Sequence, residues 1–532
     1  MDYPHETFSD AERARLAPHF SNLDRPVFAL VNLPETVKGA LFARYSRYPG
    51  TLRRLFLDEF AEDLPDAGGA AFDASEGARA AGLYERVFVG YGDDSVAQLG
   101  GAHVACEWVS NVLTKRLQRP RLGAYLEQST RYIAYDAPMP GGGYRFYRDP
   151  ELGPAYVTAM TELFDIYTRS LPIVGAWAAE QFPPAAGESA GAHARAVRAK
   201  ALDLLRGLLP AASLSHMGIF ASGQTYEQLV LHLLADPLPE ARDCGAQILE
   251  AVKAVMPSFV SRVERPERGG AWIDYLRRRE QTAARSVARL GLDRAAADTE
   301  RPSVRLLHVE GDEERLLAAL LFEAAGRSET DLLQAIRALD NGTRAAMLTD
   351  LVGDRANRRH RPGRGFEALR YRFEIVSDYG AFRDLQRHRM LTVQWQTLGP
   401  HLGAGVPAEV TAAGAGADYR RALETSRREW ERLVQDGQER AAPYALCLGF
   451  RIRFVLDLNA REAMQLIELR SGREGHPSYR AVAHEMHARI AAVHPAVAAA
   501  MRHVDDSSEP RLERILAEIR SDDRRAASPA QP

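Results

Sequence analysis

One short pattern occurs twice in this chain, about half of its length apart, and this repetition constrains the fold more than any other feature. LTKRLQRPRLG at 113–123 and AFRDLQRHRML at 381–391 share Leu-Gln-Arg-x-Arg. Apolar, strand-like runs that lead into a turn and an amphipathic helix begin near Val27 and again near Ser303. A duplication explains both matches, so we expect a tandem pair of similar, helix-rich α/β (α+β) domains.

The length of 532 residues also favours two cores, because one hydrophobic core rarely serves more than about 250–300 residues. The stretch DRAAADTERPS is poor in apolar residues and contains Pro302, which is typical of a linker. The run PPAAGESAGAHARAVRAK at 183–200 predicts an insertion or a mobile loop. We therefore predict an N-terminal extension (1–26), a first domain (27–290), a linker (291–302), a second domain (303–520) and a disordered tail (521–532).

The composition gives little support for binding to nucleic acids or membranes. The formal net charge is −3, so no overall basic field attracts an anionic polymer or surface. No stretch offers about 18 uninterrupted apolar residues, and the N-terminus lacks a signal-peptide core. The three cysteines lie far apart, which suits a reducing compartment. We expect a cytoplasmic protein with a small-molecule partner, no nucleic acid, no membrane and no metal ion.

Arginine is so frequent here that one Arg-x-Arg triplet is weak evidence. Of the 68 basic residues, all but four are arginines, the lysines being Lys38, Lys115, Lys200 and Lys253. Arg383 and Arg387 lie four apart on an expected helix, so several cations could converge on one anion. The alternative is a solvated arginine face.

A compact polar segment at 127–131 combines a carboxylate, an amide, two hydroxyls and an arginine. Such a set can bind both ends of a nucleotide, with the arginine on the phosphate and the other groups on the sugar and base. The alternative is a capping turn before the loop DAPMPGGG.

A second polar stretch follows the strand-like run RFVLDLN. Asn459 is placed to cap the next helix, and a helix N-terminus also suits phosphate. Arg461 and Arg470 belong to that helix. Further along, His484 and His487 lie three apart, which would allow a zinc pair, but a partly exposed helix face is the simpler interpretation.

The order and spacing of these pieces resemble the flavin-dependent thymidylate synthase family, whose motif is R-H-R-x-x-S-x-N-E-x-S-x-R-Y. The second copy keeps the triplet and departs afterwards; its residues are Arg387, His388, Arg389, Thr392, Gln394, Trp395 and Thr397. The first copy has Pro120 inside the triplet, between Arg119 and Arg121. It keeps the later part of the motif, as Glu127, Ser129, Arg131 and Tyr132. Each copy thus resembles a different part of the motif.

Other segments of the family also have counterparts. Ser95 stands in Gly-Asp-Asp-Ser-Val, which is similar to the family's flavin-binding G-H-x-S-V. Asn459, Arg461 and Arg470 match the downstream N-x-R and L-R. Arg206 resembles an arginine that binds the substrate phosphate. The first copy has lost the counterpart of Arg470, and the second copy has Pro443 in place of Arg206.

The resemblance implies reductive methylation of dUMP to dTMP, with FAD as cofactor and methylenetetrahydrofolate and NADPH as co-substrates. It implies catalytic roles for Arg470, which would polarise the uracil ring, and for Ser129. The implied cofactor-binding residues are Ser95, Arg119, Arg121, Arg387, His388, Arg389, Asn459 and Arg461. The implied substrate-binding residues are Glu127, Gln128, Ser129, Arg131, Arg206 and Arg470.

The complementary losses allow two opposite hypotheses. In the first, the halves build a composite site from Glu127, Ser129, Arg131 and Arg206 together with Arg387, His388, Arg389 and Arg470. Family sites form between subunits of a homotetramer, so this hypothesis implies a homodimer of tandem chains that acts as a pseudo-tetramer. In the second, the chain is a catalytically degenerate flavin- or nucleotide-binding scaffold. A related methyltransferase acting on another pyrimidine nucleotide is a third alternative.

Overall fold

The structure is a computed structural model that describes residues 6–33, 35–63, 86, 97–139, 142–184, 188–292, 301–507 and 512. The chain divides into two compact units. Unit 1 comprises Met1–Thr168, Leu208–Ala296 and Glu424–Cys447. Unit 2 comprises Arg169–Gly207, Ala297–Leu423 and Leu448–Pro532. Each unit therefore contains one segment from the other half of the sequence. Residues 293–300 of the predicted linker fall outside the described residues, and so does the whole of the predicted tail.

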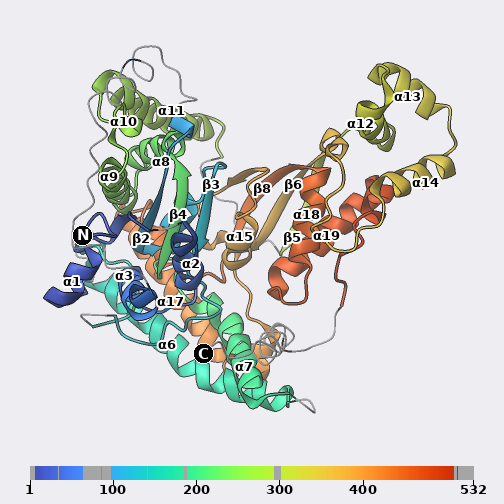
Figure 1. The fold of residues 1–532 in the computed structure, drawn as a ribbon. Coiled ribbons are helices and arrows are strands. Elements are labelled where there is room, and N and C mark those ends of the chain that lie inside the picture. The colour runs from blue at the N-terminus through green and yellow to red at the C-terminus, as the bar shows by residue number, and fades with distance from the viewer. Residues whose placement is uncertain are drawn as a thin grey trace. The chain divides into compact units, whose positions relative to one another are not determined.

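Unit 1 contains the sheet of the first half (Figure 1). Its strands are β1 (Val27–Leu30), β2 (Gly101–Ser110), β3 (Gly123–Glu127) and β4 (Leu214–Ser222). Its α-helices are α1 (Asp10–Leu16), α2 (Glu35–Tyr45), α3 (Leu52–Glu59), α5 (Asn111–Leu117), α8 (Gly223–Ala235), α9 (Pro239–Lys253), α10 (Pro257–Val260) and α11 (Ala271–Arg289). Short helical turns are η1 (Ala61–Asp63), η4 (Pro150–Leu152), η6 (Pro266–Gly270) and η9 (Ala442–Ala445). The long helix α6 (Gly153–Gln181) contributes residues to both units.

Unit 2 contains the sheet of the second half (Figure 1). Its strands are β5 (Ser303–Glu310), β6 (Arg370–Asp378), β7 (Thr392–Trp395) and β8 (Arg451–Asn459). Its α-helices are α7 (Ala190–Leu205), α12 (Glu313–Ala325), α13 (Glu329–Arg337), α14 (Asn341–Val352), α15 (Tyr379–Leu385), α16 (Ala408–Ala412), α18 (Ala460–Arg470), α19 (Pro477–Val493) and α20 (Pro495–Ala499). Turns η7 (Arg364–Ala368) and η8 (Pro400–Leu402) belong here too, while η5 (Arg206–Leu208) and α17 (Gly416–Gln435) each contribute to both units.

The two sheets have the same topology, which confirms the predicted duplication. In the described part of the chain each sheet has four antiparallel strands, in the orders β1-β2-β4-β3 and β5-β6-β8-β7. The register also repeats, because Gly101 pairs with Ser222 in one sheet and Arg370 pairs with Asn459 in the other. The fold is therefore the helix-rich α+β class expected from the sequence.

Each pair of inner strands runs straight into a helix whose first turn is capped by a side chain. Ser110 and Asp378 accept hydrogen bonds from the backbone N–H groups of Leu113 (3.0 Å) and Ala381 (2.8 Å). Ser222 and Asn459 do the same for α8 and α18. These residues satisfy N–H groups that a helix leaves open. The predicted Asn459 cap is confirmed.

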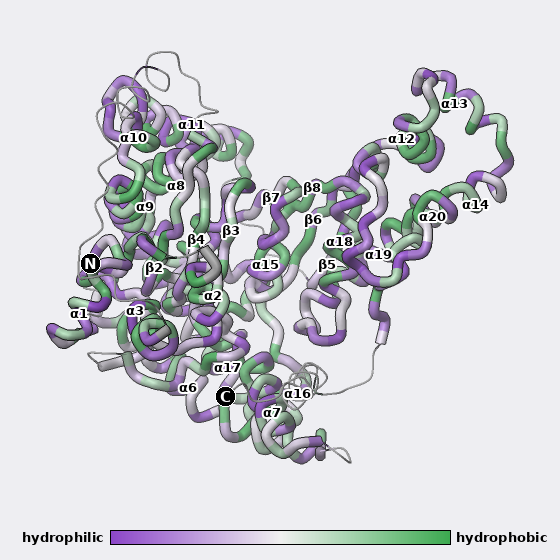
Figure 2. The backbone as a smooth tube through the Cα atoms, viewed as in Figure 1, coloured by the Kyte–Doolittle hydropathy of each residue, from purple (hydrophilic) through white to green (hydrophobic). Residues whose placement is uncertain are grey.

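The strands differ in how they are buried. In unit 1, every residue of β2 after Gly101 is buried, so this strand is covered on both faces. In unit 2, β8 alternates, and its buried side chains include Phe454, Leu456 and Leu458. The core under β1 includes Phe20, Phe28 and Phe56, whose rings meet edge to face. Hydrophobic residues recur along the strands of both sheets (Figure 2).

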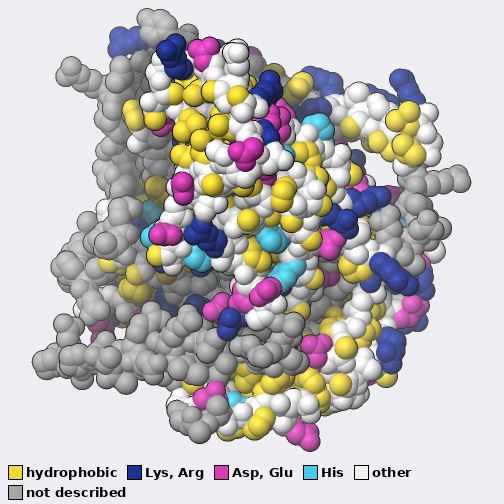
Figure 3. Space-filling model, turned by 90° about the vertical axis from the view of Figure 1, so that its right-hand side faces the viewer, with side chains coloured by type: hydrophobic (Ala, Val, Ile, Leu, Met, Phe, Trp, Pro, Cys, Tyr) yellow, Lys and Arg dark blue, Asp and Glu magenta, His cyan; other side chains and the backbone are white. Residues whose placement is uncertain are grey.

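The expectation of a mobile loop at 183–200 is wrong for residues 190–200. Helix α7 begins at Ala190, and Ser189 caps it by accepting from Ala192 N–H at 3.1 Å. The alternative of an insertion stays a prediction. The alanines and arginines that follow Ser189 are strong helix formers, and they outweigh the two glycines in this run. Within the described ranges, none of the helices combines the length and apolarity needed to cross a bilayer. On the face shown in Figure 3, basic and acidic side chains are interspersed.

Candidate functional site

The Arg387-His388-Arg389 triplet follows α15 in unit 2. The capping bond at Asp378 fixes the first turn of this seven-residue helix, and Gln386 closes its end. The triplet leaves the helix with alternating exposure: Arg387 is exposed, His388 is buried and Arg389 is half-buried. The histidine therefore faces the protein interior.

His388 lies between a carboxylate and an arginine that both belong to α18. Its Nδ1 is 3.0 Å from Oε1 of Glu462, and its Nε2 is 3.0 Å from Nε of Arg470. Burial, assisted by the Arg470 cation, lowers the pKa of His388 although Glu462 opposes the shift. The ring is therefore neutral near pH 7. Because Arg470 can only donate, Nε2 accepts, and the proton is on Nδ1 and donated to Glu462.

These contacts fix the orientation of Arg470. Its guanidinium carbon lies 5.5 Å from the ring centre of Tyr479, which adds a cation–π contact to the His388 hydrogen bond. Burial lowers the pKa of Arg470, and the nearby Asp384 carboxylate opposes that shift. Arg470 stays charged at neutral pH, since its ordinary pKa is far above 7.

Arg206 comes from the first half of the sequence but belongs to unit 2, where it lies beside α15. Its side chain is 5% exposed, and its Nη1 donates to Oδ2 of Asp384 at 3.2 Å. Its Nη2 lies 4.0 Å from Oδ1 of Asp378 and has no hydrogen-bond partner although it is buried. A buried donor without an acceptor is unfavourable, so this atom is a suitable contact for a ligand oxygen.

Gly380 makes this approach of Arg206 feasible. A Cβ at position 380 would lie 2.9 Å from Oδ1 of Asp378 and 3.1 Å from both Nε and Nη2 of Arg206. These distances are tighter than normal packing, so a larger residue would push the guanidinium away from α15.

Asp384 connects Arg206 with the triplet. Its Oδ1 lies 3.6 Å from Nη1 of Arg387, and its charge raises the pKa of both His388 and Arg470 against the lowering effect of burial. Three predicted cations, from Arg206, Arg387 and Arg470, thus share one carboxylate. The sequence pattern does not single out Asp384, although its spacing of three residues from Arg387 at the end of an expected helix is a usable signal. It also does not single out Glu462 or Gly380, whose roles depend on contacts across the fold.

The other predicted residues of unit 2 have partners within the protein. Asn459 caps α18, and Arg461 donates from Nε to the Pro362 carbonyl at 3.0 Å. Arg461 also lies 3.6 Å from Glu367. The cofactor-binding roles predicted for these residues and for Arg389 stay predictions.

In unit 1, the polar segment at 127–131 is tied into a buried network. Nζ of Lys115 lies 2.9 Å from Oε2 of Glu127, and both side chains are 1% exposed. Nε2 of Gln118 donates to the same oxygen at 3.0 Å. The Glu127 carboxylate therefore already has strong internal donors.

Gln128 and Ser129 also make turn and core contacts. The Gln128 amide donates to the Tyr48 carbonyl and accepts from Nη2 of Arg145, each at 2.7 Å. The hydroxyl of Ser129 accepts from the backbone N–H of Arg131 at 3.3 Å, as expected for a turn. The nucleotide-binding roles predicted for Gln128, Ser129 and Arg131 stay predictions.

The remaining predicted residues of unit 1 are Arg119 and Arg121, which are exposed just beyond α5, and Ser95. Ser95 lies outside the described residues. None of these positions tests the predicted flavin contacts.

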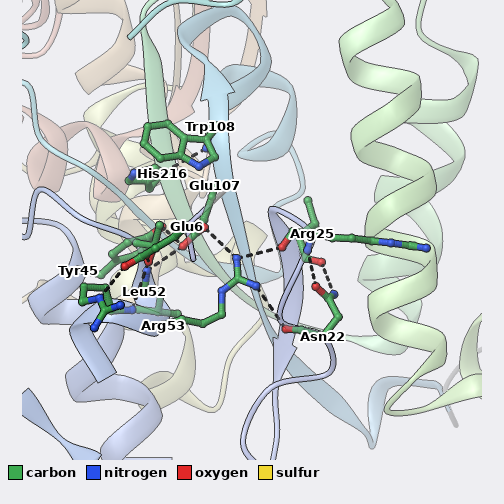
Figure 4. Close-up of polar contacts among 12 residues, drawn as sticks. Glu6, Asn22, Arg25, Tyr45, Leu52, Arg53, Glu107, Trp108 and His216 are labelled. Atoms are coloured by element: carbon green, nitrogen blue, oxygen red, sulfur yellow. Dashed lines mark hydrogen bonds and ion pairs between the residues drawn. The ribbon is translucent and has the colours of Figure 1, made fainter. Parts of the chain in front are cut away.

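Two buried glutamates further distinguish unit 1. Glu107 on β2 accepts from the backbone N–H of Leu52 (2.8 Å) and the hydroxyl of Tyr45 (3.1 Å), and it pairs with Arg53 at 3.4 Å (Figure 4). Glu240 accepts from the backbone and hydroxyl of Ser110 and from the hydroxyl of Tyr444 at 2.6–2.8 Å. Burial raises the pKa of both carboxyls. These clusters join separate elements and leave little access for a ligand.

The positions of unit 2's cluster can be compared between the copies by counting from the helix caps. Glu462 and Arg470 are the third and eleventh residues after Asn459, and the equivalents after Ser222 are Thr225 and Leu233. Pro120 replaces His388 in the first copy, whereas Pro443 replaces Arg206 in the second copy. The first copy has therefore lost every member of the Glu462–His388–Arg470 set.

The histidines near the C-terminal end do not form a metal centre with other residues. Over the described ranges, no three His, Cys, Asp or Glu side chains are placed to hold a metal ion. Nε2 of His487 instead contacts the Ala498 carbonyl at 3.2 Å, which supports the simpler helix-face interpretation of His484 and His487.

The family model described as thymidylate synthase complementing protein (Thy1) matches the chain twice, over residues 58–258 and 306–496. The chain belongs to the Thy1 family. This match confirms the predicted membership of the flavin-dependent thymidylate synthase family and the presence of two Thy1 segments in one chain.

Curated relatives share this tandem length. A UPF0159 protein of Chlamydia muridarum is 37% identical and spans 96% of this Thy1 chain and 98% of its own length. One from Chlamydia pneumoniae is 36% identical over 97% of this chain and 98% of its own. One from Thermoplasma acidophilum is 30% identical over 91% and 98%.

Among solved structures, the chain has a partial similarity to the UMP/dUMP methylase PolB from Streptomyces cacaoi bound with 5-Br dUMP. The identity is 20%, the match spans 38% of this chain and 94% of PolB, and the TM-score is 0.31. A TM-score of this size is too low to support an inference about this Thy1 protein.

Proposed function

We propose that this Thy1 protein catalyses the reductive methylation of dUMP to dTMP, with methylenetetrahydrofolate and NADPH as co-substrates and FAD as cofactor. The observation that carries the proposal is Arg206, a buried arginine with an unpartnered Nη2 beside the Arg387-His388-Arg389 triplet. A buried cation with a free donor suits the phosphate of a nucleotide.

The residues of unit 2 would divide the work. Arg206 would bind the substrate phosphate through Nη1 and Nη2. Arg470 would face the uracil carbonyl, where negative charge develops during the reaction, and its fixed orientation lowers the cost of reorganising the site. Neutral His388 would act as a positioning residue for Arg470, because its two ring nitrogens hold Glu462 and Arg470.

The donors around the end of α15 fit a flavin nucleotide. Exposed Arg387 and half-buried Arg389 present two guanidinium groups close in sequence, a set that suits a pyrophosphate. Bound there, FAD would supply the hydride chemistry of the reaction.

We extend the proposal to the composite site and the assembly. Glu127, Ser129 and Arg131 of unit 1 would contribute contacts to the substrate, and two tandem chains would associate as a pseudo-tetramer. The alternative of a degenerate scaffold is favoured by one specific observation, the internal pairing of Glu127 with Lys115 in unit 1. A methyltransferase that acts on another pyrimidine nucleotide would use the same phosphate site.

Rescue of a thymidine-requiring strain tests the reaction. We expect the wild-type chain and an Arg169→Ala control to support growth without thymidine, and Arg206→Ala to fail at equal expression. Arg169 is the matched control because its pair with Asp418 is on the surface of the same unit. Release of tritium from C5 of labelled dUMP by purified protein gives the direct readout. A well-expressed wild-type chain that neither rescues growth nor releases tritium would favour the scaffold or another pyrimidine.

A further inference from the structure

The Arg206 site contains an anion of its own. Asp384 accepts from Arg206 at 3.2 Å and lies 3.6 Å from Arg387, and its side chain is only 14% exposed. Asp378 lies 4.0 Å from the other end of the Arg206 guanidinium. The charges of Arg206 and Arg387 are thus balanced by those of Asp384 and Asp378, and Arg470 is a third cation that interacts with Asp384.

This arrangement is unusual for a phosphate site. A phosphate monoester carries a charge of about −1.5 to −2 at neutral pH. Its oxygens would compete with the Asp384 carboxylate for the same guanidinium groups, and two anions that share one pair of cations repel each other strongly at low dielectric. Phosphate can therefore bind fully only when Asp384 gives up its contact with Arg206.

A comparison of the two units shows that the carboxylate accompanies the arginine. In unit 1 the residue equivalent to Asp384 is Arg116 on α5, and it pairs with Asp236 at 2.6 Å. Unit 1 also contains Pro443, the residue that the second copy has in place of Arg206. The acidic residue is thus found in the unit that also contains the buried cation.

We propose that Asp384 is a specificity-determining residue, an internal counterion that the ligand's phosphate replaces. This inference rests on the proposed nucleotide function. A dianionic phosphate monoester can engage both Nη atoms of Arg206 and so outcompete one carboxylate. A monoanion cannot offset the contacts that Asp384 loses. Asp384 therefore lowers the affinity for every anion and selects for the doubly charged phosphate.

The experiment measures binding of dUMP, deoxyuridine and inorganic phosphate to the full-length chain by calorimetry. Asp384→Asn keeps the side-chain shape and removes the charge. We expect dUMP to bind about ten-fold more tightly to this variant, because a like charge has been removed from the phosphate's position. Deoxyuridine, which has no phosphate, should bind equally to both. Asp418→Asn is the matched control, since it removes a carboxylate of the same unit that pairs with Arg169.

The outcomes separate this inference from the proposed function. Unchanged or weaker dUMP binding by folded Asp384→Asn overturns the counterion role, while binding by the wild type leaves the proposed function intact. Absence of dUMP binding in wild type, Asp384→Asn and Asp418→Asn alike overturns both. If Asp384→Asn does not fold, Asp384→Ser removes the same charge and is subject to the same criteria.

Discussion

The strand–helix–triplet region of unit 2 and that of unit 1 have the same topology and different chemistry. In unit 2, α15 leads to His388, which is held by Glu462 and Arg470. In unit 1, α5 leads to Pro120, and the matching positions hold Thr225 and Leu233. A set that is lost as a whole in one copy and kept as a whole in the other behaves as one functional group.

The buried charges of unit 1 have a different use. Lys115 with Glu127 and Arg53 with Glu107 are ion pairs whose side chains are at most 6% exposed. Such pairs are strongly unfavourable to break and are satisfied within the protein. We infer that these two buried pairs of unit 1 stabilise its fold, whereas the cations beside the triplet of unit 2 serve a ligand.

The largest effect is expected when Arg470 of unit 2 is replaced by leucine, the residue at the equivalent position of unit 1. Arg470→Leu should lower the turnover of dUMP by about 100-fold or more, since a fixed cation aimed at developing charge contributes on that scale. Steady-state tritium release measures this change. Arg473→Leu is the control. Arg473 lies three residues after Arg470 and pairs with Asp505. A turnover of Arg470→Leu that lies within about two-fold of the wild-type value would show that Arg470 is not a catalytic residue.

The next effect concerns stability and unit 1. Lys115→Met should lower the free energy of unfolding by about 3–5 kcal/mol, because it leaves Glu127 buried without its cation. Arg169→Met, which breaks an exposed pair, should change it by less than about 1 kcal/mol. Urea denaturation of both variants provides the comparison. Equal losses would mean that the buried pair has no special structural role.

A pH effect of moderate size should follow from His388. Its pKa is lowered in the folded protein, so the unfolded chain binds more protons as the pH falls below about 6.5. The stabilising contribution of neutral His388 is therefore present above that pH and is lost as the pH falls through the folded pKa, at up to about 1.4 kcal/mol per pH unit. His388→Asn should flatten this slope in denaturation experiments between pH 7.5 and 5.5. His216 in unit 1, whose pKa is also lowered by burial, should keep its own contribution in that variant.

The smallest effect is expected at Gly380. Gly380→Ala places a Cβ 2.9 Å from Oδ1 of Asp378 and 3.1 Å from the Arg206 guanidinium, so both groups must shift and we expect about five-fold weaker dUMP binding. Val112→Ala at the equivalent position of α5 should leave dUMP binding unchanged, since unit 1 has no arginine to displace. Binding that is equally affected by both changes would show that Gly380 does not serve Arg206.

Much of the fold was predictable because its signals are local. Apolar runs and capping residues identified β1, β5 and the Asn459 cap, and the repeated Leu-Gln-Arg-x-Arg identified the duplication. The error at 183–200 was also local, since glycine and proline near 183–191 concealed a helix that Ser189 starts.

The site was harder to predict because its groups meet through the fold. Arg387, His388 and Arg470 were selected from the sequence, but their arrangement around Asp384 and Glu462 joins α15 to α18 across some 80 residues of chain, as the His388–Arg470 separation of 82 shows. Arg206 is part of unit 2 because the segment Arg169–Gly207 belongs to that unit, whereas the sheet of the first half belongs to unit 1. No local sequence pattern indicates this division. Long-range pairings of this kind have no periodicity to detect.

The number of dUMP molecules bound per chain decides whether unit 2 alone provides a substrate site. Calorimetric titration of the wild-type chain and of Arg206→Ala gives the stoichiometry and its dependence on the buried arginine. We expect one dUMP per chain in the wild type and no measurable binding in the variant. Two molecules per chain, or binding that survives Arg206→Ala, would contradict this expectation.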